Sequence, residues 1–529
     1  MKFSTLFIVA TSAASFSAAT PIDWYSWTID KAGQAFFGNF REKEEFNVPV
    51  NSEGPYQVLK PLVSSEALQA LILEPALKIA ANKLYYAATL SQGMYGHPTR
   101  IIGSPGHFAT LREVEGKLRS TGSYFNITKQ YFDAVRGVVF HSGLSVDGIK
   151  ISEALPFDLT PPTPKKSWVS APLVLVKNQG CEISDFPSAA NGSIVLIERG
   201  VCAFGDKSQL AGLSGAVAAV IFNNIPGDGV FSGTLGTPLP DQVATIGVSY
   251  EVGTAWAHKL ALNISLNASA YVDSFVKNVT TYNIIAETRD GDPNNVVMLS
   301  AHSDSVQYPG INDDGSGTIS LVEVALGLSK FSVNNTVRFA WFSGEEEGLL
   351  GSDYYVAQLS PEENIKIRVA MDYDMMASPN FAYQVYDANN KVNPNGSGNL
   401  KQLYIDYYNS QNLNHTLIPF DGRSDYDAFI KNGIPAGGIA TGAEGIKTPE
   451  EAEMFGGVAG QPYDSCYHQL CDDTTNLNYE AWMVNTKLIA HSVASFARSF
   501  ERFPVREPLA VSNENQKYSY KYHGSKLVL

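Results

Sequence analysis

Five short polar signatures, each placed just after an apolar run, constrain this chain more than any other feature. They are HSD at 302–304, NDDGSG at 312–317, EEEG at 345–348, DYD at 372–374 and CYH at 466–468. Together they offer two imidazoles and several carboxylates, which are ligand types that zinc takes in proteins. In open α/β sheets ligands bind beyond the carboxyl ends of the strands. We therefore expect these side chains to gather at one edge of a sheet.

After residue 280, apolar runs of strand length alternate with helical patterns. We expect strands at 296–300, 336–342, 365–371 and 434–440, and helices at 318–328 and 479–500. Such alternation predicts an α/β fold with a mixed sheet that is parallel at its centre and flanked by helices. His302 follows the first strand, Glu345 follows the second and Asp374 lies at the end of the third. Three separate strands thus deliver ligand-type residues to one edge.

Two earlier regions have other patterns. Residues 64–122 carry amphipathic helical repeats that are interrupted by the sequence GSPG at 103–106. Residues 145–280 carry short apolar runs, such as 173–176 and 194–197, separated by Gly, Asn and Pro. This second pattern predicts a small β-rich domain.

The N-terminus has the pattern of a secretory signal peptide. It begins MKF, continues with an apolar stretch at 6–16 and reaches small residues at 18–19. The stretch is shorter than the roughly 20 apolar residues that a membrane span needs, and no other segment qualifies. We expect no membrane anchor and a location in the secretory pathway, either extracellular or in the vacuolar lumen. The mixed charges of residues 20–55 are compatible with a pro-segment.

Glycosylation sequons and cysteines agree with that compartment. Eight N-x-Ser/Thr sites occur, at Asn126, Asn191, Asn263, Asn267, Asn278, Asn334, Asn395 and Asn414. The four cysteines, Cys181, Cys202, Cys466 and Cys471, allow three disulfide pairings. We choose the local pairing, Cys181 with Cys202 and Cys466 with Cys471. Free buried thiols and a zinc knuckle at 466–471 are the alternatives, and the knuckle lacks a second cysteine pair nearby.

The net charge of the chain limits the kinds of molecule that it can bind. The formal net charge is −15 and the pI is about 5.1, which disfavours a nucleic-acid partner because phosphates would be repelled. An acidic chain can still bind metal, since the acidic ligands belong inside the site. Hydrophobic residues make up 44% of the chain, so we expect it to be globular, and we expect a monomer.

Each signature also has an ordinary structural interpretation. A lone histidine such as His302 is more often a satisfied core or surface residue, and Asp and Ser commonly begin helices, as 313–317 could. The glutamates at 345–347 could be a solvated acidic helix start. Adjacent glutamates also allow one to bind metal while its neighbour takes a proton from the attacking water. Two zinc ions with such a glutamate can hydrolyse an amide bond.

These motifs resemble the co-catalytic zinc aminopeptidases of the aminopeptidase Y type, a fungal and bacterial family that includes fungal leucine aminopeptidases. The resemblance covers about 280–500 closely, with the helices at 64–122 as the first part of the same zinc-peptidase fold. Residues 145–280 resemble an inserted protease-associated domain, on the strength of Gly180-Cys181 and the sequence IERGVCAF at 197–204.

The resemblance implies a role for each site residue and two zinc ions per chain. The implied metal ligands are His302 and Asp374 for one ion, Glu346 and His468 for the other, and Asp313 between both. The implied catalytic residues are Glu345 as general base, Asp304 orienting His302, and Tyr467 donating to the oxyanion; Arg423 would contact the substrate. The sequence GLLGS at 348–352 sets the register of the three glutamates, and Asp374-Met375 with SPN at 378–380 selects Asp374 over Asp372.

This chain departs from the family pattern at two positions. Asp372 stands where relatives commonly carry Asn, which adds a negative charge near the site. Glu347 stands where an apolar residue is usual.

The resemblance also implies the reaction and the domain order. The reaction is zinc-dependent release of single residues from peptides with a free N-terminus, with apolar residues such as Leu preferred. A carboxypeptidase, a glutaminyl-cyclase-like enzyme on the same scaffold and a non-catalytic receptor-like ectodomain are the alternatives. The predicted domains are a signal peptide at 1–19, a possible pro-segment at 20–55, the N-terminal part of the peptidase domain at 56–144, the protease-associated domain at 145–280, the zinc peptidase domain at 281–503 and a flexible tail at 504–529.

Overall fold

The computed structural model describes residues 60–227 and 229–507, and the backbone of 522–523 and 526–527. The predicted signal peptide at 1–19 and the predicted pro-segment at 20–55 lie outside the described residues, as does most of the predicted tail. In the tail, only two short strands, β15 (Tyr522–His523) and β16 (Lys526–Leu527), are described beyond residue 507.

Four parallel strands form the centre of the peptidase sheet. They are β9 (Asp292–His302), β10 (Asn335–Phe342), β11 (Ile367–Tyr373) and β14 (Ala436–Ala440), in the order β14-β11-β9-β10. In this register Leu299 of β9 pairs with Phe339 of β10 and Met371 of β11. The edges are mixed, because β12 (Gln384–Tyr386) runs antiparallel to β14 and β8 (Asn267–Thr288) antiparallel to β10. A short strand, β13 (Thr416–Ile418), continues parallel to β12. The predicted mixed sheet with a parallel centre is confirmed.

Side chains alternate between two apolar layers along each central strand. On β9, Val297 and Leu299 belong to one buried cluster and Val296 and Met298 to another. The first layer is covered by α2 (Ser65–Gln69), α3 (Glu74–Thr89), α5 (Pro105–Arg119), α8 (Gly315–Leu328), α11 (Ser397–Ser410) and α14 (Tyr479–Arg498). The second is covered by α9 (Leu350–Ala357) and α12 (Tyr426–Lys431). Because both faces of the sheet are covered, the sequences of the central strands are nearly continuous apolar runs. The remaining helices are α4 (Gln92–Tyr95), α10 (Pro361–Lys366) and α13 (Pro449–Phe455).

Several element boundaries differ by a few residues from the sequence-based expectation. The GSPG break at 103–106 is also a helix start, because α5 begins at Pro105 and the hydroxyl of Ser104 accepts a hydrogen bond from the His107 amide. Proline is tolerated there because the first helical N–H has no partner within the helix. The strand expected at 296–300 extends to His302 itself, so this imidazole is carried by the sheet rather than by a loop.

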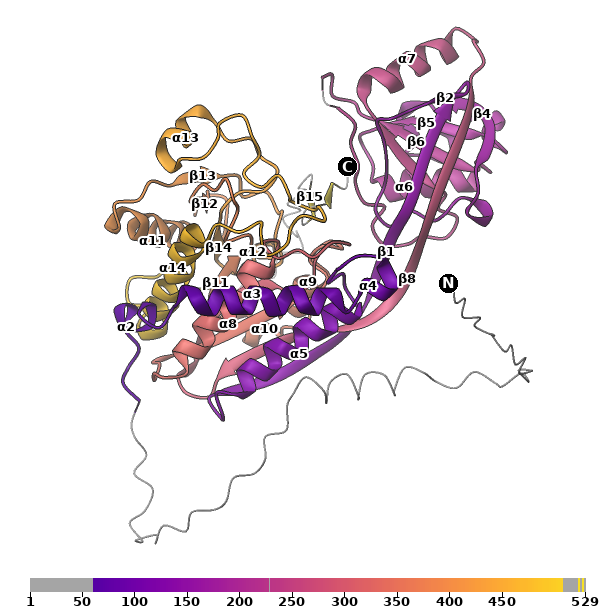
Figure 1. Ribbon diagram of the computed structural model, residues 1–529. Helices are drawn as coiled ribbons and strands as arrows, with labels where there is room; N and C mark the ends of the chain where they lie inside the picture. The colour runs from indigo at the N-terminus through magenta and orange to yellow at the C-terminus, as the bar shows by residue number, and fades with distance from the viewer. Residues whose placement is uncertain (1–59, 228, 508–521, 524–525, 528–529) are drawn as a thin grey trace, which may run out of the picture. The chain divides into compact units, whose positions relative to one another are not determined.

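A long two-stranded ribbon joins the peptidase sheet to the inserted domain. It consists of β1 (Phe125–Val146) and β8, which pair antiparallel from Phe125 with Thr288 to Val146 with Ala268 (Figure 1). At one end β8 pairs with β10, and at the other with β4 (Val169–Leu175). Both ribbon strands run across the domain boundaries predicted from the sequence, which stay predictions.

The inserted region has its own parallel sheet. Its strands are β4, β5 (Ile194–Glu198), β6 (Ala218–Phe222) and β7 (Thr245–Val248), with β3 (Ala154–Pro156) antiparallel at the edge. Residues of α6 (Phe204–Leu213) and α7 (Tyr250–Ala261) pack on its apolar clusters. The region therefore contains two helices that the β-rich expectation did not include. Smaller elements are β2 (Ile149–Lys150) and 3-10 helices at Pro164–Lys166, Asn178–Gly180, Ile183–Asp185 and Ser188–Ala190.

The predicted local pairing of the cysteines is present. Disulfides join Cys181 to Cys202 and Cys466 to Cys471, which leaves no thiols for a zinc knuckle. All eight sequon asparagines are exposed, as attachment of a glycan requires. Among the residues that the structure describes, no helix is long and apolar enough to cross a membrane.

Candidate active site

The carboxyl ends of three neighbouring strands bring the predicted site residues together. His302 is the last residue of β9, Glu345 and Glu346 follow β10, and Asp374 follows β11. Parallel strands end at the same edge of a sheet, so side chains placed at these ends converge. Asp313, in the turn before α8, and His468, in the disulfide loop, complete the group.

The carboxylate of Asp313 lies between two sets of possible metal ligands. Its Oδ1 is 3.3 Å from Nε2 of His302, which is itself 3.7 Å from Oδ1 of Asp374. Its Oδ2 is 3.0 Å from Nε2 of His468, which is 3.2 Å from Oε2 of Glu346. Each oxygen of Asp313 therefore faces one imidazole and one further carboxylate. This is the donor arrangement expected for two cations that share one bridging carboxylate.

Several of these atoms are buried and lack a hydrogen-bond partner. Within residues 60–227 and 229–507, no partner is found for either ring nitrogen of His302, for Nε2 of His468, for Oδ1 of Asp374 or for Oε1 of Glu345. Buried polar atoms are normally satisfied, and an orphaned one indicates a missing ion or water. The residues present therefore fit a pair of zinc ions.

The two imidazoles and the carboxylates perturb one another strongly. Burial opposes a charge on His302, but Asp304, Asp313 and Asp374 outweigh burial and raise its pKa well above the ordinary value. Burial likewise opposes ionisation of Asp313, but His302 and His468 outweigh it and lower the pKa of this carboxyl. The lowered pKa favours the ionised form of Asp313, which is the form that a metal ligand needs.

Asp313 and its neighbour Asp314 differ in the groups that their carboxylates contact. Oδ1 of Asp314 accepts hydrogen bonds from the amides of Gly317 and Met375, and Oδ2 accepts one from the amide of His302. Donor atoms of His302, Asp314 and Asp374 also lie within 4.8 Å of one another. Because three backbone amides already bind the Asp314 carboxylate, we regard it as the N-cap of α8 and Asp313 as the residue open to a metal. The helix-start interpretation of this turn therefore applies to Asp314, and the metal-ligand role of Asp313 stays a prediction.

Asp304 positions more than the histidine it was predicted to orient. Its Oδ1 is 3.8 Å from Nδ1 of His302 and accepts a hydrogen bond from the Gly344 amide at 2.8 Å. Its two oxygens also accept longer bonds from the amides of Glu345 and Glu346. This buried carboxylate thus holds the turn that carries the two glutamates, and it lies beside the His302 ring at the end of β9.

Glu345 differs from Glu346 in its surroundings. Glu346 accepts a hydrogen bond from the Val306 amide with Oε1 and faces His468 with Oε2. Glu345 lines the cleft, and burial raises the pKa of its carboxyl well above the ordinary value, with Glu346 and Asp374 adding to the effect. A carboxyl whose affinity for a proton is raised, next to the cleft, is suited to accept one during a reaction.

Asp372 and Asp374 also differ in their hydrogen-bond partners. Both oxygens of Asp372 are engaged, one by the Ser300 hydroxyl at 2.8 Å and one by the Tyr426 amide at 3.1 Å. Asp374 accepts a bond from the Ser424 hydroxyl with Oδ2 only, and its Oδ1 faces His302. Asp372 therefore ties β11 to β9 and α12, while Asp374 remains available to a cation.

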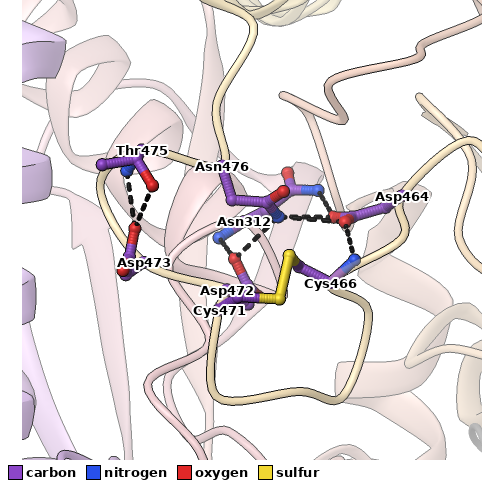
Figure 2. Close-up of a disulfide and its surroundings, with 8 residues drawn as sticks. All are labelled: Asn312, Asp464, Cys466, Cys471, Asp472, Asp473, Thr475 and Asn476. Carbon is purple, nitrogen blue, oxygen red and sulfur yellow. Dashed lines mark hydrogen bonds between the residues drawn. A yellow bond between two sulfur atoms is a disulfide. The ribbon is translucent and has the colours of Figure 1, made fainter.

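The disulfide loop is fastened to the turn before α8 by buried polar residues (Figure 2). Asp472 accepts hydrogen bonds from the amides of Asn312 at 2.8 Å and Asp313 at 3.1 Å. Asp464 accepts one from the Asn312 side chain at 2.7 Å and one from the Cys466 amide at 2.8 Å. These bonds hold His468, which lies inside the loop closed by the disulfide, against the Asp313 carboxylate.

A cavity of about 270 Å³ opens beside the two ligand sets. Its lining includes Glu345, Tyr467 and Arg423, so these three predicted residues share one space. The Tyr467 ring stacks on that of His468 with centroids 3.8 Å apart, and Arg423 forms an ion pair of 2.8 Å with Glu444. The wall also contains the apolar side chains of Met375, Ile418, Pro419 and Ala440.

The sequence interpretation missed several buried residues that support the site. The clearest are Arg100 and His107, which come from the N-terminal helical region, and Asp464 and Asp472 beside the disulfide. Nothing in the local sequence of Arg100 or His107 marks them, because their partners lie about 200 residues further along the chain. The acidic residues flanking the Cys466–Cys471 pair were visible but carried no signal of their own.

His107 is a buried histidine that contacts the residues just after β9 and β10. Its Nδ1 accepts a hydrogen bond from the Gly103 amide, so the ring is neutral and its Nε2 donates toward the hydroxyls of Ser303 and Ser343. Burial lowers the pKa of His107 to about 4. The unfolded chain therefore binds a proton near pH 6.5 that the folded chain binds only near pH 4.

We expect the zinc-free protein to lose stability as the pH falls from 6.5 to 4, by up to ~3 kcal/mol from this residue. Thermal midpoints measured across this range should fall more steeply for the wild type than for His107→Gln. Exposed His258 provides the control, and His258→Gln should follow the wild type. Parallel curves for the wild type and His107→Gln would contradict the assignment.

Comparison with protein families gives the class of the chain. Residues 283–493 match Peptidase family M28, and residues 169–256 match the PA domain. The first match contains all five predicted metal ligands, and the second lies within the inserted region. The chain belongs to peptidase family M28, and it carries an inserted PA domain.

Within that family the chain is similar to fungal aminopeptidases over most of its length. It is 51% identical to aminopeptidase Y of Saccharomyces cerevisiae over 463 residues, which cover 86% of this chain and 84% of the yeast protein. It is 42% identical to leucine aminopeptidase 2 of Trichophyton equinum, over 87% of this chain and 91% of that protein. The resemblance predicted from the sequence is confirmed.

Solved structures show the same fold. An aminopeptidase from Aneurinibacillus sp. strain AM-1 matches with a TM-score of 0.66 and 26% identity, covering 84% of this chain and 98% of that one. A zinc aminopeptidase from Bacillus subtilis matches with a TM-score of 0.55 and 24% identity, covering 80% and 96%. The combination of peptidase sheet and inserted domain is therefore shared with solved structures.

Proposed function

We propose that this chain is a zinc-dependent aminopeptidase that hydrolyses the N-terminal peptide bond of peptides and prefers apolar residues such as Leu. The observation that carries the proposal is the Asp313 carboxylate, whose two oxygens each face an imidazole and a second carboxylate. The names of the fungal relatives, aminopeptidase Y and leucine aminopeptidase 2, support the reaction class.

Five side chains would hold two zinc ions. In this proposal His302 and Asp374 bind one ion, His468 and Glu346 bind the other, and Asp313 bridges them. Bound zinc would supply polarisation of the scissile carbonyl and a lower pKa for water. Asp304 holds His302 and the turn of the two glutamates in place. The disulfide loop and its polar contacts hold His468.

Glu345 would move the proton. It lines the cleft, and its Oε1 has no hydrogen-bond partner among the described residues, so it is free to accept the proton of the attacking water. It would then give the proton to the leaving amine, because the same carboxyl faces both groups in turn. Tyr467, on the cleft wall, would donate a hydrogen bond to the developing oxyanion.

The cleft suits the N-terminal end of a peptide. The carboxylates of Asp374, Asp421 and Glu444 line it and would attract a free α-amine. The apolar wall formed by Met375 and Ile418 would accept an apolar side chain. Arg423, also on the wall, would contact the substrate. The two disulfides and eight exposed sequons support our further proposal that the enzyme acts in an extracellular or vacuolar lumen.

We expect leucine amide to be hydrolysed and N-acetyl-leucine amide to resist, because acetylation removes the charge of the α-amine. Activity should disappear on chelation and return on zinc addition. Both substrates should be assayed before chelation, after it and after add-back. Cleavage of the acetylated substrate at a similar rate would contradict the preference for a free N-terminus. Absence of both reactions in a chain with two bound zinc ions would direct attention to C-terminal and cyclisation substrates.

A further inference from the structure

Arg100 is a fully buried arginine whose whole head group binds one loop of the site. It lies between α4 and α5, outside the residues that line the cleft. Its Nε donates to the Pro309 carbonyl at 2.9 Å and its Nη1 to the Ser303 carbonyl at 2.6 Å. Its Nη2 donates to the carbonyl of Gly310 and, at 3.5 Å, to that of Asp313. All four acceptors belong to the segment that joins His302 to Asp313.

This segment has little structure of its own. Residues 303–314 contain no helix or strand, so no regular ladder pairs their carbonyls. Some carbonyls have local partners, such as that of Gly310 with the Gly315 amide, and those of Ser303 and Pro309 accept hydrogen bonds from Arg100. The backbone next to Arg100 adds two contacts, from the Arg100 amide to the Ser305 hydroxyl and from the Thr99 hydroxyl to the Val306 carbonyl. The loop that connects two predicted ligands is thus held by a segment about 200 residues earlier in the sequence.

The packing around the guanidinium leaves little freedom. A Cβ added at Gly310 would lie 2.3 Å from the Asp313 carbonyl oxygen and 3.1 Å from Nη2 of Arg100. The amide of Asp313 is held as well, because it donates a hydrogen bond to the Asp472 carboxylate. The backbone of Asp313 is therefore fixed on both sides, through its carbonyl by Arg100 and through its amide by Asp472.

The charge of Arg100 also matters. Burial lowers the pKa of Arg100, and the carboxylates of Asp304, Asp313, Asp314 and Asp472 oppose that shift. An arginine keeps its charge even when buried. It therefore offsets part of the repulsion among carboxylates that must stand close together around the site.

We infer that Arg100 is a positioning residue for the metal centre: it sets the His302–Asp313 loop so that the Asp313 carboxylate can reach both ligand sets. The inference rests on the proposed zinc centre and extends it to a residue that touches neither substrate nor metal. Arg100 binds several backbone carbonyls that lie at different positions around its head group. A planar guanidinium with five N–H donors can bind them together, whereas a lysine ammonium, a compact group with three donors, cannot.

The test measures zinc affinity separately from turnover. Arg100→Lys and Arg100→Gln should be compared with the wild type by competition with a chromophoric zinc chelator, with zinc-free thermal midpoints measured in parallel. We expect the zinc dissociation constant to rise about 10–100-fold in both variants, as for other residues that hold metal ligands in place. At saturating zinc, kcat should fall while KM stays unchanged, because Arg100 does not line the cleft.

Arg136→Lys is the matched control. Arg136 is another buried arginine, and its Nη1 donates to the carbonyl of Ile102, which lies just before α5. Its substitution should lower the thermal midpoint but leave zinc affinity within about threefold, since no ligand loop is released. Equal loss of zinc affinity in Arg136→Lys would overturn the inference, because general destabilisation would then explain the effect.

Two further results would also overturn it. If Arg100→Lys binds zinc as tightly as the wild type, Arg100 does not position Asp313; this variant decides the question where Arg100→Gln fails to fold. If the wild type itself retains no zinc, the proposed metal centre fails and this inference fails with it. The two failures are distinguished by the wild-type titration alone.

Discussion

Replacing Glu345 with Gln is expected to lower kcat by about 10²–10⁴-fold while both zinc ions stay bound. The amide keeps the shape of the side chain but cannot accept the proton of the attacking water. Glu345 has a buried oxygen without a hydrogen-bond partner among the described residues, and it lines the cleft. Steady-state kinetics and zinc content measured on the same preparation would check both parts of the expectation.

The adjacent glutamates provide internal controls for this substitution. Glu346→Gln should lose zinc as well as activity, because its Oε2 lies 3.2 Å from Nε2 of His468, the nitrogen that also faces Asp313. Glu347→Gln should retain most activity, since Glu347 does not line the cavity. If Glu346→Gln keeps its zinc and Glu345→Gln loses it, the register of the three glutamates is wrong. A Glu345→Gln protein with more than about a tenth of wild-type kcat would refute Glu345 as the base.

Replacing Asp313 with Ala is expected to remove both zinc ions and to abolish measurable turnover. The substitution deletes the carboxylate whose two oxygens face the two imidazoles, one 3.3 Å from Nε2 of His302 and the other 3.0 Å from Nε2 of His468. The activity loss should exceed the roughly 100-fold upper range seen when a supporting residue is removed, because a shared ligand itself is lost. Zinc per chain, measured by inductively coupled plasma mass spectrometry, would check the expectation.

Substitutions of single predicted ligands distinguish the two proposed zinc sites. Asp374→Ala and Glu346→Ala should each weaken one site, whereas Asp313→Ala should empty both. Asp372→Asn is the matched control, because the Asp372 oxygens already bind Ser300 and the Tyr426 amide and should not be needed for zinc. Retention of two zinc ions by Asp313→Ala would exclude the bridging role. Loss of both ions in Asp372→Asn would show that the Asp313 result is not specific.

Much of the candidate site could be predicted from local sequence. His302, Glu345 and Asp374 each stand at or just after an apolar strand, and strands that are covered by helices on both faces leave a clear apolar run. The helix-start signal at 313–317 was also readable, because Asp caps helices through its own backbone neighbours. These signals are visible because the physical cause lies within a few residues of its effect.

Other features could not be derived in this way. The ribbon of β1 and β8 pairs residues up to 163 positions apart, as Phe125 does with Thr288, and its strands carry no continuous apolar run. The division of labour between Asp313 and Asp314 depends on which carboxylate meets the amides of Met375 and His302. Neighbouring aspartates look the same in a sequence until the packing of distant segments gives them different partners.

The sequence by itself determined the class of fold and the strand ends that carry ligand-type side chains, and it favoured the local pairing of the cysteines, which the structure has. Periodicity, capping and compartment are local or compositional properties, so they can be read without coordinates. Only the tertiary structure decided which side chains hold that edge in place: Arg100 binds the Asp313 carbonyl from 213 positions away, and Asp472 binds the Asp313 amide from 159 positions away. The physical reason is that these contacts form only after the layers have packed, when a buried donor must find its acceptor wherever the folded chain has placed it.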